Sequence, residues 1–206
     1  GVPLVLDEFR VVGFGDFGGH CRGIMRKPAC LRLKKVLCSL PGMTNDERKP
    51  IVQRLLKEGL TLSQIQEVIA GLPLLPGALE FLTELRKRTQ VIILSDTFEQ
   101  FAQPLMRQLN WPTLFCHRLI VENDRIAGYQ LRQVDQKRKS VAALKSLNYR
   151  VISAGDSYND TSMLGEAHVG FLIHAPENVK REFPQFKPVE SHAALLKEIK
   201  AVLAQS

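Results

Sequence analysis

The sequence predicts an α/β fold: a doubly wound, Rossmann-like parallel sheet with a small helical cap. Short apolar runs alternate with amphipathic segments of helical period from residue 77 onward. Parallel strands need helical crossovers, so this alternation is typical of a parallel sheet with helices on both faces. The helical stretch 45–72 lies outside the alternation. We therefore assign residues 1–19 and 73–206 to the core and residues 20–72 to the cap.

The expected elements follow in chain order. A first strand is predicted at 4–7 or at 11–16, and the cap is predicted to contain helices over 48–58 and 62–70, the second capped by Thr61. In the core, strands are predicted at 91–94, 113–117, 119–122, 126–131, 150–154 and 169–173. Helices are predicted at 76–88, 98–109, 137–147, 159–167, 176–182 and 192–203. In the helix over 137–147, Val141, Leu144 and Leu147 are expected to face the core.

Composition narrows the class of protein. The chain has 206 residues and a net charge of +7, and no apolar run is long enough to span a membrane. It begins with Gly1, so we expect a trimmed or incomplete amino end. Its cysteines contain no Cys-x-x-Cys pair, which predicts reduced thiols and a cytoplasmic location (Cys21, Cys30, Cys38 and Cys116). A homodimer is compatible with these features.

A basic stretch between residues 17 and 45 contains no acid but six basic side chains (Arg22, Arg26, Lys27, Arg32, Lys34 and Lys35). It could hold an anionic ligand, touch nucleic acid, or form an ordinary solvated helix face. No aromatic residue lies among these charges, so stacking on single-stranded nucleic acid is not expected.

The segment 154–160 contains the strongest chemical signal. It follows a short apolar strand and precedes a helix, so Asp156, Asn159 and Asp160 lie in a turn at the carboxyl end of a strand. Ligands and metals bind at this edge in open α/β sheets, and Mg²⁺ prefers oxygen ligands. The alternative is structural: Asp156 ends the strand, Asn159 caps the helix, and Asp160 favours the positive helix end.

Two further segments are predicted to end at the same edge. Ser95 and Thr97 follow the strand 91–94 and offer hydroxyl and amide donors to an anion, and Lys137 opens a helix nearby. Phosphoryl transfer uses these parts together: a metal, a lysine, and donors for the phosphoryl oxygens. Alternatively, Ser95 caps the helix 98–109 and Lys137 is a surface lysine.

These segments resemble the motifs of the haloacid-dehalogenase superfamily of phosphatases. Residues 91–98 resemble its second motif, Lys137 the lysine of its third, and residues 155–160 its fourth. The sequence is similar to the phosphoserine phosphatases, and most similar to the bacterial type that also transfers phosphate to homoserine. Residues 103–109, 128–133 and 174–179 carry that closer resemblance, which covers about residues 53–190.

The resemblance implies a role for each matching residue. Asp156 would ligate Mg²⁺ directly, Asn159 would contact the substrate or metal-bound water, and Asp160 would hold Lys137 and the metal shell. Ser95 and Asp96 would bind the phosphoryl group, and Lys137 would neutralise it. An aspartate on the first strand would attack phosphorus and form an aspartyl-phosphate, which water then cleaves.

The first family motif is degenerate, because no Asp-x-Asp or Asp-x-Glu pair follows an apolar strand here. Asp7 and Asp16 are the two candidate nucleophiles, and the nearby Gly19 favours Asp16. The alternative is that both are ordinary turn acids. Loss of the second acid removes the proton donor for the leaving group, which typically costs ~10²–10⁴-fold in rate.

Residues 1–44 lose the family pattern that residues 53–190 keep. Divergence, domain replacement and a shifted reading frame are three hypotheses for this change. We expect an arginine of the cap to bind the substrate carboxylate. Arg54 is the candidate, and Arg48 is a weaker one. The sequence thus predicts a Mg²⁺-dependent phosphatase acting on O-phosphoserine, with phosphotransfer to homoserine as a second activity; the alternative is a relative that binds metal and phospho-ligand without turnover.

Overall fold

The computed structural model describes residues 4–7 and 60–205. Its strands form one seven-stranded sheet in the order β4-β3-β2-β1-β5-β6-β7. The strands are β1 (Leu4–Asp7), β2 (Val91–Phe98), β3 (Thr113–Glu122), β4 (Arg125–Gln130), β5 (Ile152–Gly155), β6 (Val169–Ile173) and β7 (Lys187–Val189). All neighbours pair in parallel except β4, which is antiparallel to β3. The predicted parallel α/β sheet is confirmed, and the predicted strand 126–131 forms its antiparallel edge as β4.

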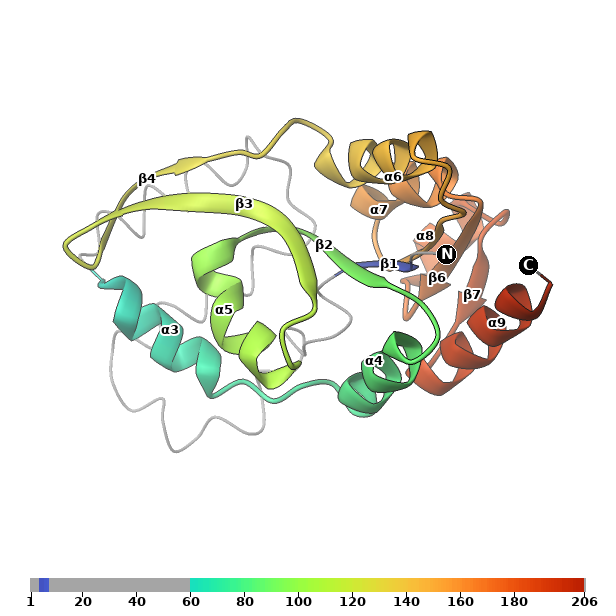
Figure 1. Ribbon diagram of the computed structural model, residues 1–206, viewed down its shortest axis with the longest axis horizontal. Coiled ribbons are helices and arrows are strands. Elements are labelled where there is room, and N and C mark those ends of the chain that lie inside the picture. Colours follow the sequence, from blue (N-terminus) through green and yellow to red (C-terminus); the bar gives the residue numbers. More distant parts are fainter. Residues whose placement is uncertain (1–3, 8–59, 206) are drawn as a thin grey trace.

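Helices cover both faces of the sheet (Figure 1). They are α3 (Leu62–Ala70), α4 (Ala78–Arg86), α5 (Glu99–Gln108), α6 (Gln136–Ser146), α7 (Tyr158–Glu166), α8 (Glu177–Glu182) and α9 (His192–Ala204). One apolar cluster joins α3, α4, α5 and α9 to the sheet, and a second joins α6, α7 and α8. Successive residues of β2 alternate between these clusters: Val91 and Ile93 belong to the first, Ile92 and Leu94 to the second. Because strand side chains alternate between faces, a fully apolar strand can pack against two layers of helices.

The order of the strands determines where the chemistry lies. β1 is in the middle of the sheet, with β2 on one side and β5 on the other. The chain builds outward from β1 through β2 and β3, then returns to build outward through β5 and β6. Open α/β sheets bind ligands where the direction changes in this way, at the carboxyl ends of the strands, which here are those of β1, β2 and β5.

The described part of the predicted cap, residues 60–72, is attached to the β3–β4 hairpin and to α5. Thr61 caps α3 as expected, and Leu62 N–H donates to the Asp124 carbonyl at the hairpin turn (2.8 Å). On the other side, the Gln66 amide donates to the Gln100 carbonyl of α5 (2.7 Å). The boundaries 20–72 of the cap remain a prediction, because residues 20–59 lie outside the described residues, as does the helix predicted over 48–58.

Several element predictions were wrong in detail. The two strands expected over 113–117 and 119–122 are one continuous strand, because β3 changes its partner from β2 to β4 along its length. β7 was not expected; it is three residues long and contains Pro188. Leu147 is 67% exposed, since it follows the last residue of α6 and its side chain is no longer on the core-facing stripe.

Within residues 4–7 and 60–205, every helix is too short or too polar to cross a bilayer.

Candidate active site

The central strand β1 brings the main chain of the first candidate acid to this edge of the sheet. Asp7 is the last residue of β1, and its Cα is paired with that of Leu94, immediately before Ser95. On its other side β1 pairs with β5, where Leu6 is in register with Ala154 at the start of the Gly155–Asp160 loop. The main chain at Asp7 therefore lies between the second and fourth motif segments, which are far apart in sequence.

The loop from Gly155 to Asp160 is folded around a buried carboxylate. Asp160 is fully buried, and its Oδ2 accepts from the main-chain N–H of Asp156 (3.0 Å), from the N–H of Ser157 (3.1 Å) and from the Ser157 hydroxyl (2.9 Å). Ser157 is the N-cap of α7 and Asp160 its third residue, so the two form a capping box. A Cβ at Gly155 would lie 2.5 Å from that of Asp160, so only glycine fits beneath the carboxylate.

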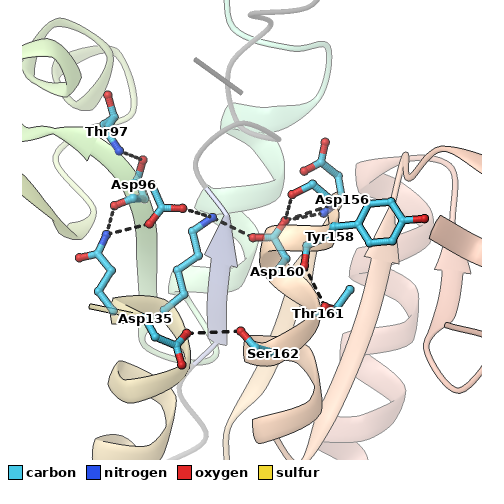
Figure 2. A network of polar contacts seen from close by, with 12 residues as sticks. Asp96, Thr97, Asp135, Asp156, Tyr158, Asp160, Thr161 and Ser162 are labelled. Carbon is cyan, nitrogen blue, oxygen red and sulfur yellow. Dashed lines mark hydrogen bonds and ion pairs between the residues drawn. The ribbon is translucent and has the colours of Figure 1, made fainter. Parts of the chain in front are cut away.

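Lys137 supplies the counter-charge for this buried acid. Its Nζ lies 2.8 Å from Asp160 Oδ1 and 3.4 Å from Asp96 Oδ2 (Figure 2). Burial by itself raises the pKa of Asp160. The charge and hydrogen bond of Lys137, with the donors of the loop, outweigh burial and hold that pKa below its ordinary value. The ion pair therefore links α6 to the loop before α7 and keeps Asp160 ionised.

The second motif segment is the last part of β2, where the register with β3 shifts between Leu94 and Phe98 and the Ser95 hydroxyl closes a local turn. Ser95 is buried, and its hydroxyl accepts from the Thr97 N–H (3.0 Å). The side-chain amide of Gln136 donates to the Ser95 carbonyl and to Asp96 Oδ1 (3.4 Å). The first residue of α6 thereby fixes the turn, while the next residue, Lys137, extends toward Asp160.

The described residues at this edge offer few carboxylate ligands to a Mg²⁺ ion. Within the described part of the chain, no three His, Cys, Asp or Glu side chains form a metal-binding cluster. Both oxygens of Asp160 are engaged by Lys137 and the loop. The resemblance assigns the metal to Asp156, which is half-buried at the start of the loop. Mg²⁺ keeps several waters and commonly uses one or two carboxylates with substrate phosphate oxygens, so this donor set is compatible with it.

The structure brings together Ser95, Asp96, Lys137, Asp156 and Asp160, five of the residues singled out from the sequence. Asn159 is half-buried in the first turn of α7. Asp16 and Arg54 lie outside the described residues, and their roles remain predictions.

Sequence reasoning missed two contributors. Ser157 had a usable signal, because serine three residues before an acid at a helix start is a capping-box pattern. Gln136 had none: it is an uncharged residue at the first position of a helix, and only the fold buries it against Ser95 and Asp96.

Comparisons with known proteins agree with this geometry. Residues 28–168 match the haloacid dehalogenase-like hydrolase family. The chain is 65% identical over 147 residues to the phosphoserine phosphatase ThrH of Pseudomonas aeruginosa, a match that covers 70% of this chain and 72% of that protein. It is 64% identical over 147 residues to the phosphoserine phosphatase of Pseudomonas syringae pv. tomato, covering 70% of this chain and 62% of that protein.

A solved substrate-bound phosphoserine phosphatase complex has the same fold, with a TM-score of 0.72 at 18% identity over 97% of each chain. At this identity the likeness concerns the fold alone, whereas the sequence matches extend over most of the chain. The resemblance inferred from the three motifs is thereby confirmed. The chain belongs to the haloacid dehalogenase-like hydrolase family.

Proposed function

We propose that this protein is a phosphomonoester hydrolase that acts on O-phosphoserine and uses Mg²⁺. One observation carries the proposal: a buried lysine, Lys137, lies against Asp160 at the sheet edge where the Ser95 turn and the end of β1 meet. A cation beside hydroxyl and amide donors is the arrangement that stabilises a phosphoryl group during transfer. We infer the substrate from the two Pseudomonas relatives, which are phosphoserine phosphatases and match at 65% and 64% identity.

Each side chain has a proposed task. The Ser95 hydroxyl and the N–H groups of its turn, including that of Asp96, donate to phosphoryl oxygens, and Lys137 neutralises their charge. Asp160 holds the Lys137 ammonium and the loop in place. Asp156 is the proposed direct Mg²⁺ ligand, Asn159 contacts the substrate, and Arg54 binds its carboxylate. A bound Mg²⁺ would supply further positive charge to the phosphoryl oxygens.

The reaction begins with a carboxylate oxygen, which attacks phosphorus as the bond from phosphorus to the serine oxygen breaks. The alkoxide takes a proton from a water molecule and leaves as serine, and the phosphoryl group remains on the enzyme as an acyl phosphate. A water molecule then attacks, phosphate leaves, and the carboxylate is regenerated. The alcohol of homoserine in place of that water would give the proposed phosphotransfer.

We favour Asp7 as the nucleophile over Asp16, because its main chain ends β1 directly beside Leu94 and Ser95. The sequence preference for Asp16 was based on Gly19 alone. In central β1 the main chain also has both motif segments as neighbours.

A second candidate function is supported by the degenerate first motif. Without an acid two residues after the nucleophile, the leaving oxygen loses the usual proton donor, a loss worth ~10²–10⁴-fold in rate. The protein would then bind Mg²⁺ and a phospho-ligand but release phosphate slowly or not at all.

Phosphate release from O-phosphoserine at saturating Mg²⁺ separates these functions. We expect turnover in the parent, its loss in Asp156→Asn and Asp7→Asn, and its retention in Asp16→Asn. Asp124→Asn, far from the site in the β3–β4 turn, is the matched control and should keep the parent rate. Turnover that survives Asp156→Asn would contradict the proposed site, and a folded parent that binds phosphate without turnover would establish the non-catalytic alternative.

A further inference from the structure

The lysine of this site is flanked by two carboxylates that are held in different ways. Asp160 is completely buried and both of its oxygens are engaged, one by Lys137 at 2.8 Å and the other by three donors of the loop. The Asp96 side chain is 19% exposed and its oxygen lies 3.4 Å from the same Nζ. Asp160 is therefore part of the framework, whereas Asp96 is a partly exposed counter-ion at a longer distance from the same lysine.

Asp96 does not reach Lys137 unaided. Its other oxygen is 3.4 Å from the Gln136 amide nitrogen, which also donates to the Ser95 carbonyl. Gln136 is only 2% exposed, and within the described residues its own carbonyl oxygen has no hydrogen-bond partner. Burying an amide oxygen without a hydrogen bond costs free energy of folding. The contacts that hold Gln136 are therefore those made by its NH₂ group.

The backbone before Gln136 is also unusual. Asp135 is the N-cap of α6 and has a left-handed conformation (φ 52°), although it is not glycine. Such conformations persist where the surrounding structure requires them. The two residues that follow Asp135, Gln136 and Lys137, both reach the Asp96 carboxylate.

We propose that Asp96, held by Gln136, is a counter-charge that limits how tightly Lys137 binds a phosphate group. This inference rests on the proposed function, since it assumes that phosphate binds at Lys137. A phosphate dianion and the Asp96 carboxylate compete for the same ammonium, and the two anions repel each other across a short distance. The result is weaker retention of the product phosphate, which favours its release after each turnover.

The test is direct binding of inorganic phosphate, measured by calorimetry at pH 7.5 with saturating Mg²⁺. Asp96→Asn keeps the shape of the side chain and an oxygen that can accept from Gln136, but removes the charge. We expect its Kd for phosphate to fall about 3- to 10-fold at low ionic strength, and the gain to shrink as salt screens the charges. The matched control is Asp124→Asn, which removes an equal charge from an exposed carboxylate in the β3–β4 turn; its Kd should remain within about 2-fold of the parent.

Gln136→Leu tests the positioning role. Once released from the amide, Asp96 should spend less time at Lys137, so phosphate should bind somewhat more tightly, by about 2-fold. In the Asp96→Asn background the same substitution should change nothing, because the charge it positions is already gone. Equal effects in both backgrounds would show that Gln136 has only a structural role and would overturn this part.

The outcomes distinguish this inference from the proposed function. Phosphate binding in the parent that Lys137→Met abolishes, but that Asp96→Asn leaves unchanged, overturns the inference alone. Weaker binding in Asp96→Asn also overturns it and makes the Asp96 side chain a direct phosphate ligand. Absence of Mg²⁺-dependent phosphate binding in the folded parent contradicts both proposals.

Discussion

Asp160 and Asp124 make nearly the same local contacts at the start of a helix, in two different regions of the molecule. At α7, Asp160 Oδ2 accepts from the Ser157 N–H (3.1 Å) and hydroxyl (2.9 Å). At α3, Asp124 Oδ1 accepts from the Ser63 N–H (3.0 Å) and hydroxyl (2.9 Å). Asp124 belongs to the turn between β3 and β4 and is exposed, whereas Asp160 lies within its own helix and is buried.

The two acids differ because the buried one, Asp160, is paired with a cation and the exposed one, Asp124, is held by hydrogen bonds. Burial raises the pKa of each carboxyl, and hydrogen bonds lower it, but only Asp160 has a buried ammonium on its second oxygen. An isolated buried charge is very costly, so the lysine is required for Asp160 to stay ionised. Asp160 and its lysine form a buried ion pair at the edge of a parallel sheet, where ligands bind. The same hydrogen bonds at the exposed Asp124 only attach a hairpin to a helix.

The largest expected effect comes from breaking the buried pair. Lys137→Met leaves Asp160 buried without its cation and should lower the free energy of unfolding by about 3–5 kcal/mol, measured by urea denaturation. The double variant Lys137→Met/Asp160→Leu should recover part of this loss. Lys145→Met is the matched control, because its pair with Glu166 also joins α6 to α7 but is partly exposed, and it should cost at most about 1 kcal/mol. Equal losses from the two lysines would contradict the distinction drawn between the two regions.

A smaller effect is expected from filling the space beneath Asp160. In Gly155→Ala the new methyl group lies 2.5 Å from the Asp160 Cβ, so the loop must move, and we expect a loss of about 1–3 kcal/mol. In Gly165→Ala, within α7, the nearest atom is 3.9 Å away, and replacing a helical glycine should stabilise by about 0.5–1 kcal/mol. Thermal unfolding of the two variants checks the pair; a tolerated Gly155→Ala would show that the loop is less constrained than its contacts indicate.

The smallest expected effect is pH-dependent and concerns Asp124. Burial raises its pKa, but the hydrogen bonds from Ser63 outweigh this, so the pKa is below the ordinary value of 3.8. A carboxyl with a lowered native pKa stabilises the fold above its unfolded pKa, and this stabilisation is lost as pH falls through the native value. Asp124→Asn should therefore be less stable than the parent at pH 6–7, and the two should converge below about pH 3–4 in urea titrations. In a Ser63→Ala background the difference at pH 6–7 should be smaller, and an undiminished difference would show that the hydroxyl is not its source.

Local sequence signals were sufficient for most elements and for the acids of the loop before α7. α3 and β6 have the predicted bounds, because Thr61 with Gln64 makes a capping box and residues 169–173 form an apolar run ended by turn residues. Asp156 and Asp160 were placed in one turn by their spacing alone. Such features depend on contacts between residues that are close in the sequence, so they can be predicted from the order of the amino acids.

The tertiary structure alone decided the features that depend on distant contacts. The insertion of β1 between β2 and β5 puts Asp7 beside Leu94, and no local pattern distinguishes it from the candidate strand at 11–16. Gln136 is a site residue only because α6 packs over the Ser95 turn, and Asp124 caps a helix 61 residues earlier in the chain. The sequence determined which residues can be charged, apolar or capping; the packing of strands and helices determined which charges are buried together, because burial and pairing are properties of neighbours in space.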